Sequence, residues 1–286
     1  MEDLSLQATV IEPKITKASL KMALMSPAGL SKVWVLLEGE PDVKVFSQFF
    51  SEQTISVKQA INDRGRGGYK IVEDIVTSLS SEFPKANILG IRDKDYTPYY
   101  VPAYQLPDNV FITDKKDLEM TLADAPSVRA CLSRELPEFV AAEDKISPAI
   151  RQMGYIRAYA GCNSIKCQFD KIFKAAKIWD ESTRSLHDGW KTYCDNSVET
   201  HIGVTSTDID SFVALRGLDK KSLFDVGRGH DYVAYLSKAM VDIATYSEDF
   251  ISGIMYNNYS KADFASTQLC ASIKSWQQAR GVMVVE

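Results

Sequence analysis

The amino-acid sequence predicts an α/β protein: a parallel β-sheet flanked by helices, with a helical insertion and a C-terminal elaboration. Apolar, β-rich runs alternate with amphipathic stretches over residues 30–125, which is typical of a parallel sheet with helices on its faces. Helical periodicity dominates over residues 126–218. Of the 286 residues, 45% are hydrophobic and 25% charged, as in an average globular chain that is long enough to bury a core.

Four apolar runs are the expected strands of the sheet. Val33–Leu37 is continuous and rich in Val and Leu, the pattern of a strand buried on both faces. The other three runs lie at residues 55–61, 87–91 and 110–113. Helices are expected at residues 41–50, where Pro41 suits a first turn, at residues 69–81, and from about Asp117.

The second half of the chain is expected to be mostly helical. Residues 165–179 have helical periodicity, residues 223–226 form a candidate short strand, and residues 232–244 and 264–280 are expected closing helices. We therefore divide the chain into an N-terminal extension (1–29), an α/β core (30–125), a helical insertion (126–218) and a C-terminal part that completes the core (219–286).

Composition excludes several classes of protein. With 33 Lys and Arg against 38 Asp and Glu, the net charge of −5 excludes a wholly basic nucleic-acid coat but leaves room for a local basic patch. No apolar run approaches the ~20 residues that span a bilayer, and the N-terminus lacks a secretory signal, so no membrane association is expected. Five cysteines without a C-x-x-C pair indicate reduced thiols, and hence a cytoplasmic protein.

Acidic side chains follow three of the four expected strands. Glu38 comes directly after the first strand, and Asp42 lies four residues later in the first turn of a helix. Asp93 and Asp95 follow the third strand, and Glu119 comes shortly after the fourth. Because functional groups gather outside the carboxyl ends of parallel strands, we expect these five carboxylates to share one crevice.

Such an acidic cluster is typical of a hard-metal site. Neighbouring carboxylates raise each other's pKa unless cations compensate them, and oxygen ligands without Cys or His favour Mg²⁺ or Mn²⁺. A bound Mg²⁺ can activate water for phosphodiester cleavage. Taken alone, an Asp-x-Asp pair is more often a solvated turn; the joint placement of the five residues favours the metal site.

Several basic residues are candidates for nucleic-acid contacts. Arg64, Arg66 and Lys70 surround a glycine-rich loop at an expected helix N-terminus, which indicates either a phosphate-binding loop or a solvated turn. His230, in the sequence Arg-Gly-His-Asp, is either a substrate contact or proton carrier, or part of a helix-capping turn with Asp231 as the cap.

Two further groups have alternative interpretations. A set of lysines near helical spacing could meet an RNA backbone or form the wet face of an amphipathic helix: Lys166, Lys171, Lys174 and Lys177. Three tyrosines after the Asp-x-Asp pair could stack on unpaired bases or fill the core or an interface: Tyr96, Tyr99 and Tyr100.

Two motifs of the chain resemble those of the TOPRIM superfamily. Residues 33–42, VWVLLEGEPD, are similar to its opening strand-Glu-Gly motif, and residues 88–95, ILGIRDKD, to its Asp-x-Asp motif. The resemblance covers roughly residues 30–125 and implies a Rossmann-like TOPRIM core. The glycine loop, the sequence Asp117-Leu118-Glu119 and residues 228–231 make the chain most similar to a stand-alone branch from anti-phage loci, the effector nucleases of the PARIS defence system.

The resemblance implies metal-dependent phosphodiester chemistry. By motif position, Glu38 would be a metal ligand or general acid/base, Asp93 and Asp95 metal ligands, and Asp42 and Glu119 further ligands. A lysine acting on transition-state charge is also implied; the candidates are Lys115, Lys116 and Lys70.

The resemblance further implies the biological setting. The nuclease would cleave structured RNA, tRNA in particular, as the toxic effector of an abortive-infection system and as a homodimer when active. An ABC-type ATPase in trans would hold it inactive, in agreement with the lack of a Walker A motif in this chain. The alternatives are an OLD-like DNA endonuclease and a catalytically silent regulatory subunit that binds an ATPase.

Overall fold

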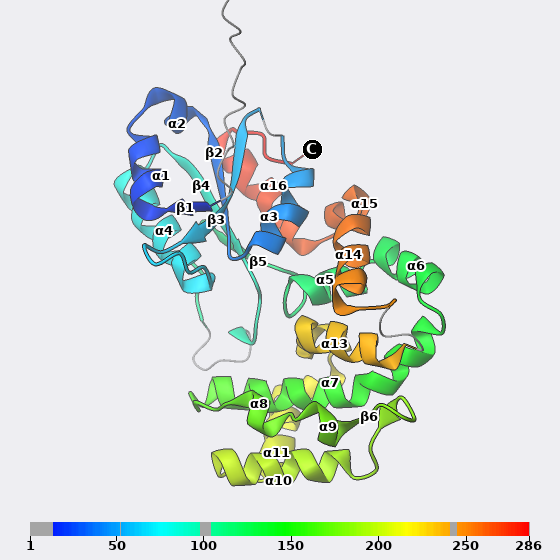
Figure 1. Ribbon diagram of the computed structural model, residues 1–286. Coiled ribbons are helices and arrows are strands. Elements are labelled where there is room, and N and C mark those ends of the chain that lie inside the picture. Colours follow the sequence, from blue (N-terminus) through cyan, green and yellow to red (C-terminus); the bar gives the residue numbers. More distant parts are fainter. Residues whose placement is uncertain (1–13, 52, 98–103, 241–244, 286) are drawn as a thin grey trace, which may run out of the picture. The chain divides into compact units, whose positions relative to one another are not determined.

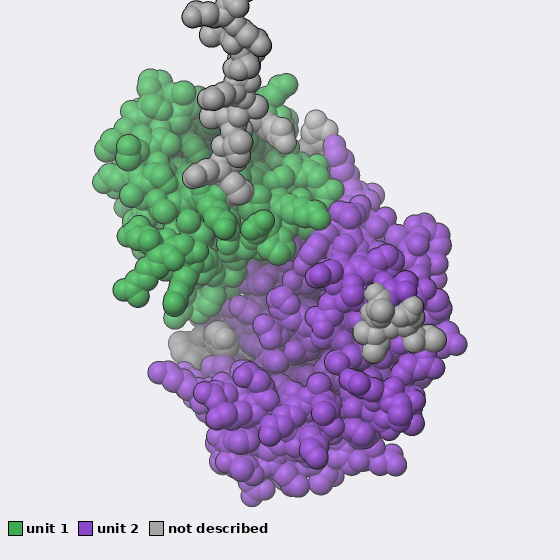
Figure 2. Space-filling model, viewed as in Figure 1, with its two compact units in different colours: residues 1–92, 107–111, 273–286 green, residues 93–106, 112–272 purple. Residues whose placement is uncertain are grey.

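The computed structural model describes residues 14–51, 53–97, 104–240 and 245–285. The chain forms two compact units, shown in different colours in Figure 2. Unit 1 comprises residues 1–92, 107–111 and 273–286, and unit 2 comprises residues 93–106 and 112–272. The chain therefore passes from one unit to the other directly after the strand that precedes the Asp-x-Asp pair.

Unit 1 is built on a five-stranded β-sheet with the order β1-β3-β2-β4-β5. The strands are β1 (Lys14–Thr16), β2 (Val33–Leu37), β3 (Ile55–Ile61), β4 (Asn87–Arg92) and β5 (Val110–Ile112), whose last residue belongs to unit 2. β1 pairs with β3, β3 with β2, and β2 with β4, all in parallel. Every side chain of β2 is buried, because this central strand is covered on both faces.

Helices cover this sheet. They are α1 (Lys17–Leu24), α2 (Pro27–Ser31), α3 (Glu40–Phe46), the short 3₁₀ helix η1 (Ser47–Phe49), α4 (Tyr69–Glu82) and the C-terminal part of α16 (Gln268–Arg280). α1 and α4 lie on one side of the sheet and α3 on the other (Figure 1). The sequence therefore predicted the α/β class and the flanked parallel sheet correctly, whereas β1 was not predicted.

Unit 2 is mainly helical. Its helices are α5 (Leu118–Asp124), α6 (Pro126–Glu135), α7 (Phe139–Cys162), α8 (Phe169–Ile172), α9 (Ala175–Ile178), α10 (Trp190–Ile202), α11 (Ser206–Arg216), the 3₁₀ helix η3 (Leu218–Lys220), α12 (Leu223–Val226), α13 (Gly229–Ala239), α14 (Glu248–Asn258), α15 (Lys261–Ala265) and the start of α16. A small hairpin joins β6 (Trp179–Asp180) to β7 (Ser185–Leu186). The 24-residue α7 packs against α11, α12 and α13.

Three sequence-based expectations for the second half of the chain were wrong in whole or in part. Residues 223–226 form helix α12 instead of a strand, because the Ser222 side chain accepts a hydrogen bond from Asp225 N and begins a helical turn. Residues 165–179 do not form one helix, because the backbone leaves the helical conformation at Phe173 and Lys174. Residues 264–280 form two helices, separated at Ser266 and Thr267.

The first of the two expected closing helices is displaced toward the N-terminus. Residues 232–244 were expected to be helical, but α13 begins earlier, at Gly229, and ends at Ala239. Residues 241–244 lie outside the described ranges. None of the helices within those ranges has the length and apolar character that a membrane span requires.

Candidate functional site

Glu38 lies at the carboxyl end of the central strand of unit 1. It directly follows Leu37, which pairs with Gln59 of β3 on one side and with Ile91 of β4 on the other. The chain runs from β2 to β3 on one side of β2, whereas β4 lies on its other side, so the sheet has a topological switch point between β2 and β4. Ligands of open α/β sheets bind outside the carboxyl ends of the strands at such a point.

Asp42 lies in the first turn of α3, as predicted. Its Oδ2 accepts a hydrogen bond from Gly39 N at 3.0 Å, so the carboxylate satisfies a backbone donor at the start of the helix. The bond fixes the turn that joins Glu38 to α3. The side chain of Asp42 is half-buried.

The glycine-rich loop packs against the backbone of Glu38. A Cβ atom on Gly67 would lie 2.3 Å from the Glu38 carbonyl oxygen, so the chain can approach this closely only with glycine at position 67. Gln59 Nε2 donates to the same carbonyl oxygen at 3.2 Å. The fold therefore brings the predicted phosphate-binding loop to the predicted metal ligand within unit 1.

The loop holds its cations at the surface. Asn62 Oδ1 accepts hydrogen bonds from Arg64 N at 2.9 Å and Arg66 N at 3.0 Å, which fixes the turn. The side chains of Arg64, Arg66 and Lys70 are exposed, and in the described part of the chain none of the three forms an ion pair. They are thus available to an anionic ligand.

In unit 2, the Asp-x-Asp pair is bonded to the segment that begins α5. Asp93 Oδ1 accepts a hydrogen bond from Leu118 N at 2.9 Å. Asp95 has a φ of 50°, a left-handed conformation that Asp tolerates better than most residues. Its amide donates to Lys116 O at 2.7 Å, and its Oδ1 accepts from Lys116 Nζ at 2.7 Å. Lys116 therefore holds Asp95 through both backbone and side chain.

Lys116 is a buried, fully compensated cation. Only 5% of the residue is exposed, and its Nζ lies 3.6 Å from Asp117 Oδ2 and 4.8 Å from the centre of the Tyr96 ring. Burial alone would lower the pKa of this lysine, but Asp117, Tyr96 and Asp95 together raise it above its ordinary value. Lys116 is consequently charged at neutral pH and would be a poor proton donor there.

Asp117 joins two distant segments of unit 2, a role that the sequence analysis missed. One oxygen accepts from Met120 N at 3.0 Å and caps α5, and the other accepts from Gly229 N at 2.9 Å. A Cβ atom on Gly229 would lie 2.3 Å from Glu119 Cβ. The glycine of the Arg-Gly-His-Asp sequence is thus required by close packing against the start of α5.

The remaining acidic and histidine candidates lie nearby in unit 2. Glu119 Oε1 accepts a hydrogen bond from Tyr256 OH at 3.2 Å. His230 is exposed in the first turn of α13. Asp231 forms an ion pair with Arg157 at 3.0 Å and makes no capping bond, since Arg228 occupies the N-cap position; the capping interpretation of Asp231 was therefore wrong.

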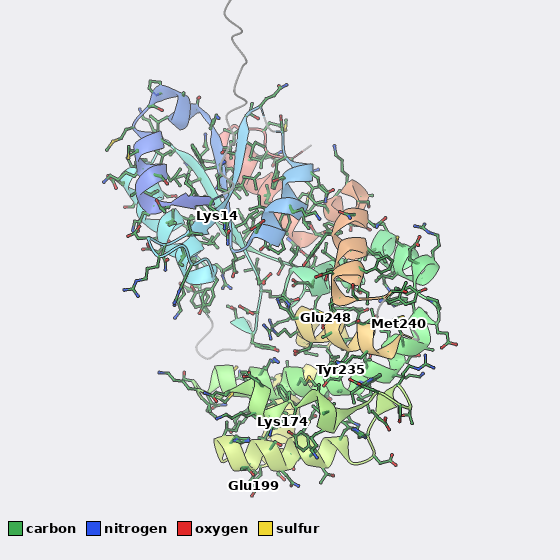
Figure 3. All side chains as sticks on the ribbon, viewed as in Figure 1. Lys14, Lys174, Glu199, Tyr235, Met240 and Glu248 are labelled. Carbon is green, nitrogen blue, oxygen red and sulfur yellow. The ribbon has the colours of Figure 1, made fainter. Side chains whose placement is uncertain are left out.

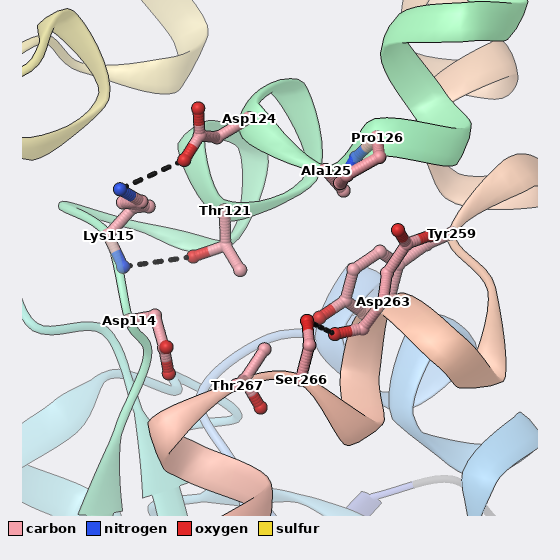
Figure 4. Close-up of a pocket in the computed structure, with 10 residues that line it drawn as sticks. All are labelled: Asp114, Lys115, Thr121, Asp124, Ala125, Pro126, Tyr259, Asp263, Ser266 and Thr267. Atoms are coloured by element: carbon pink, nitrogen blue, oxygen red, sulfur yellow. Dashed lines mark hydrogen bonds and ion pairs between the residues drawn. The ribbon is translucent and has the colours of Figure 1, made fainter.

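Lys115 lines a pocket of unit 2 that is drawn in Figure 4. Its Nζ pairs with Asp124 at 2.9 Å, and its amide donates to Thr121 Oγ1. Lys115 and Asp124 line a cavity of about 120 Å³ together with Asp263 and Tyr259. Burial lowers the pKa of Lys115 and its bond to Asp124 raises it, with a net increase.

The structure distinguishes between the two interpretations for one of the three tyrosines that follow the Asp-x-Asp pair. Tyr96 is buried, and its hydroxyl donates to Val226 O at 3.1 Å. Burial raises the pKa of this hydroxyl. Tyr96 is therefore a core residue, whereas Tyr99 and Tyr100 lie outside the described residues.

The acidic residues have the right chemistry for a hard cation, but they are not gathered as a complete site. Among the described residues, no group of three or more His, Cys, Asp or Glu side chains is arranged to hold a metal ion. Glu38 and Asp42 belong to unit 1, whereas Asp93, Asp95 and Glu119 belong to unit 2. All five candidates offer oxygen ligands only, which suits Mg²⁺ or Mn²⁺ and disfavours zinc. For Asp95 to bind such an ion, the ion would have to share it with the Lys116 ammonium.

No protein-family model matches the chain, and no curated protein matches it. The TOPRIM resemblance therefore stays a prediction from the sequence.

Proposed function

We propose that the protein is a Mg²⁺- or Mn²⁺-dependent nuclease of the TOPRIM type that cleaves RNA, with tRNA as the expected substrate. The observation that carries this proposal is the juxtaposition in unit 1 of Glu38, at the switch point of the sheet, with the loop that presents Arg64 and Arg66. An acidic residue and unpaired cations at the end of a central strand are the parts that phosphodiester cleavage needs.

The proposed roles follow from position. Glu38, which follows β2 in unit 1, would hold the cation. Asp93 and Asp95 are the further ligands that the TOPRIM resemblance implies. The bound cation would polarise a phosphoryl oxygen and lower the pKa of water. Arg64, Arg66 and Lys70 would bind the phosphate on either side of the scissile bond. Lys116 is a positioning residue, because it fixes the orientation of Asp95.

The biological setting rests on the resemblance alone. We include in the proposal that the nuclease is the toxic effector of an anti-phage system, that it acts as a homodimer, and that an ABC-type ATPase keeps it inactive. None of the contacts described above bears on these partners. A test of the chemistry therefore comes first.

A second function, a catalytically silent regulatory subunit, is favoured by one observation. The Lys116 ammonium already compensates the charges of Asp95 and Asp117, so these two carboxylates are stable without any metal. On this alternative the acidic residues would serve the fold, and the protein would act by binding an ATPase.

Cleavage by purified protein separates these functions. Total tRNA and plasmid DNA are incubated with wild type, Glu38→Gln and Glu40→Gln, in Mg²⁺, Mn²⁺ or EDTA. Glu40 is the matched control, because it is an exposed acid two residues away in the same turn. We expect metal-dependent tRNA cleavage that Glu38→Gln lowers by about 100-fold or more and Glu40→Gln leaves unchanged.

The other outcomes are equally informative. Cleavage of DNA alone would favour the OLD-like endonuclease. Full activity of Glu38→Gln would contradict the assignment of Glu38. Absence of cleavage of both nucleic acids would favour the regulatory subunit.

A further inference from the structure

A second basic region lies in unit 2, far along the sequence from the glycine-rich loop. We define the basic segment as residues 166–177, which contain α8 and most of α9. Four lysines of this segment are exposed, and within the described ranges none of them forms an ion pair: Lys166, Lys171, Lys174 and Lys177. The only acidic residue within the segment is Asp170. In a chain with a net charge of −5, such a concentration of unpaired cations needs an explanation.

The basic segment contributes to a cavity of about 410 Å³. Lys166, Cys167, Gln168 and Lys171 line it from the segment, and His201 lines it from the end of α10. α8 and α9 both pack against α10, which brings His201 to the lysines. No carboxylate is among these lining residues: they supply two ammonium groups, a thiol, an amide and an imidazole. This set of groups selects an anion.

The acidic neighbours of the cavity lie outside it. Figure 3 labels Lys174 on the basic segment and Glu199 on α10. Glu199 is exposed, two residues before His201, and is not a lining residue. Asp170 is likewise exposed and does not line the cavity. Neither carboxylate therefore closes the cavity to an anion.

An aromatic pair lies within the same segment. Phe169 and Phe173 stack with a centroid distance of 5.7 Å and an angle of 9° between their planes. The Arg157 guanidinium lies 4.9 Å and 5.0 Å from the two ring centres, and Arg157 is itself held by Asp231 at 3.0 Å. Both rings are half-buried. Arg157 therefore holds the pair on its buried side, while part of each ring is exposed beside the lysines.

We propose that the basic segment and His201 form a binding site for a single-stranded nucleic-acid segment, with a phosphate group in the cavity. Unpaired cations together with aromatic rings are the combination that single-strand binding uses, since lysines meet the phosphates while bases stack on the rings. Bases of a duplex are already stacked on each other and would leave the rings without a ligand. The inference goes beyond the proposed function, because it assigns a binding site that needs neither Glu38 nor a metal.

Binding is measured by fluorescence anisotropy, with the whole chain, a labelled RNA of about 20 nucleotides, and EDTA to prevent cleavage. The test variant carries Lys166→Ala and Lys171→Ala. We expect its affinity to be roughly tenfold weaker near ~0.1 M salt, and the slope of log affinity against log salt to fall by about 1.4. Lys166→Arg with Lys171→Arg should restore both, because the charges return.

The matched control removes two exposed lysines elsewhere in unit 2, with Lys220→Ala and Lys261→Ala. Its affinity should change by less than about twofold. Equal losses in the two alanine double variants, or an unchanged salt slope in the test variant, would overturn the site. So would a wild-type chain that does not bind the RNA. A duplex of the same sequence that binds as tightly would overturn the single-stranded ligand.

The inference and the proposed function fail separately. Binding in EDTA without any cleavage in Mg²⁺ would leave the site intact and refute the nuclease. Cleavage by a chain whose affinity does not depend on Lys166 and Lys171 would do the reverse.

Discussion

The cations of unit 1 and those in the interior of unit 2 have opposite surroundings. Arg64 and Arg66 are exposed on a loop whose backbone is fixed by Asn62, and neither has an acidic partner in the described part of the chain. Lys116 and Arg157 are largely buried, and each is paired with a carboxylate. An exposed cation without a partner can bind a ligand, whereas a buried paired cation mainly holds the fold together.

This difference teaches how to sort charged candidates. From the sequence, Arg64 and Lys116 were both candidate functional residues, because residue spacing alone does not reveal which cations have acidic partners. The basic segment of unit 2 follows the unit 1 pattern, which is why we assign it to binding. The comparison yields three predictions, from the largest expected effect to the smallest.

The first prediction concerns a substitution that disrupts the packing around the acidic residues of unit 2. Gly229→Ala places a Cβ atom 2.3 Å from Glu119 Cβ and should lower the free energy of unfolding by about 3 kcal/mol. Gly253→Ala is the control, because its added Cβ has no atom within 4 Å apart from its chain neighbours and the backbone of its own helix, and it should change stability by less than about 1 kcal/mol. Urea unfolding measures both. Equal stability of the two variants would show that Gly229 is not tightly packed.

The second prediction compares one lysine from each unit. Lys116→Met removes the cation between Asp95 and Asp117 and should destabilise the protein by about 2 kcal/mol, since both carboxylates lose their compensating charge. Lys70→Met, at an exposed position, should change stability by less than about 0.5 kcal/mol. Thermal unfolding of both variants checks this. A larger loss of stability in Lys70→Met than in Lys116→Met would contradict the contrast between exposed and buried cations.

The third prediction concerns an acid in unit 2. Burial raises the pKa of Asp263, but hydrogen bonds from Ser127 and Ser260 outweigh it and lower the pKa below its usual range. The stabilisation is therefore present above the unfolded pKa of about 3.9 and is lost as pH falls through the lower folded pKa.

Asp263→Asn should make unfolding less dependent on pH in that acidic window, whereas Asp219→Asn, at an exposed position, should leave the dependence unchanged. Urea unfolding at several pH values measures this. An identical acid dependence in wild type and Asp263→Asn would contradict the assignment.

The sequence predicted much of unit 1 because its elements carry strong local signals. The apolar run Val33–Leu37 and the position of Glu38 directly after it required no tertiary knowledge. β1 was missed because a strand of three residues, Lys-Ile-Thr, has too little pattern to distinguish it from a loop. The contact of Gly67 with Glu38 was also invisible, since it depends on how two strand ends meet in the sheet.

Unit 2 was less predictable because its local signals are short. The four residues of α12 are apolar enough to suggest a strand, and only the Ser222 cap determines their helical form. His201 was assigned no role, since a lone histidine carries no pattern; packing of α8 and α9 on α10 brings it to the lysines. Asp117 was likewise noticed only as part of a motif, and its bond to Gly229 spans more than a hundred residues.

The division of unit 1 between both ends of the sequence has a consequence for synthesis on the ribosome. Unit 1 uses residues 1–92 and 273–286, so β1 to β4 are made about 180 residues before Ile273 to Val285. At about 5–20 residues per second, this delay lasts roughly 10–35 s. Trp276, which donates to Asn109 Oδ1, and the buried Val284 and Val285 arrive only then. Part of the apolar surface of unit 1 therefore stays uncovered on the ribosome until residues 273–285 have been made.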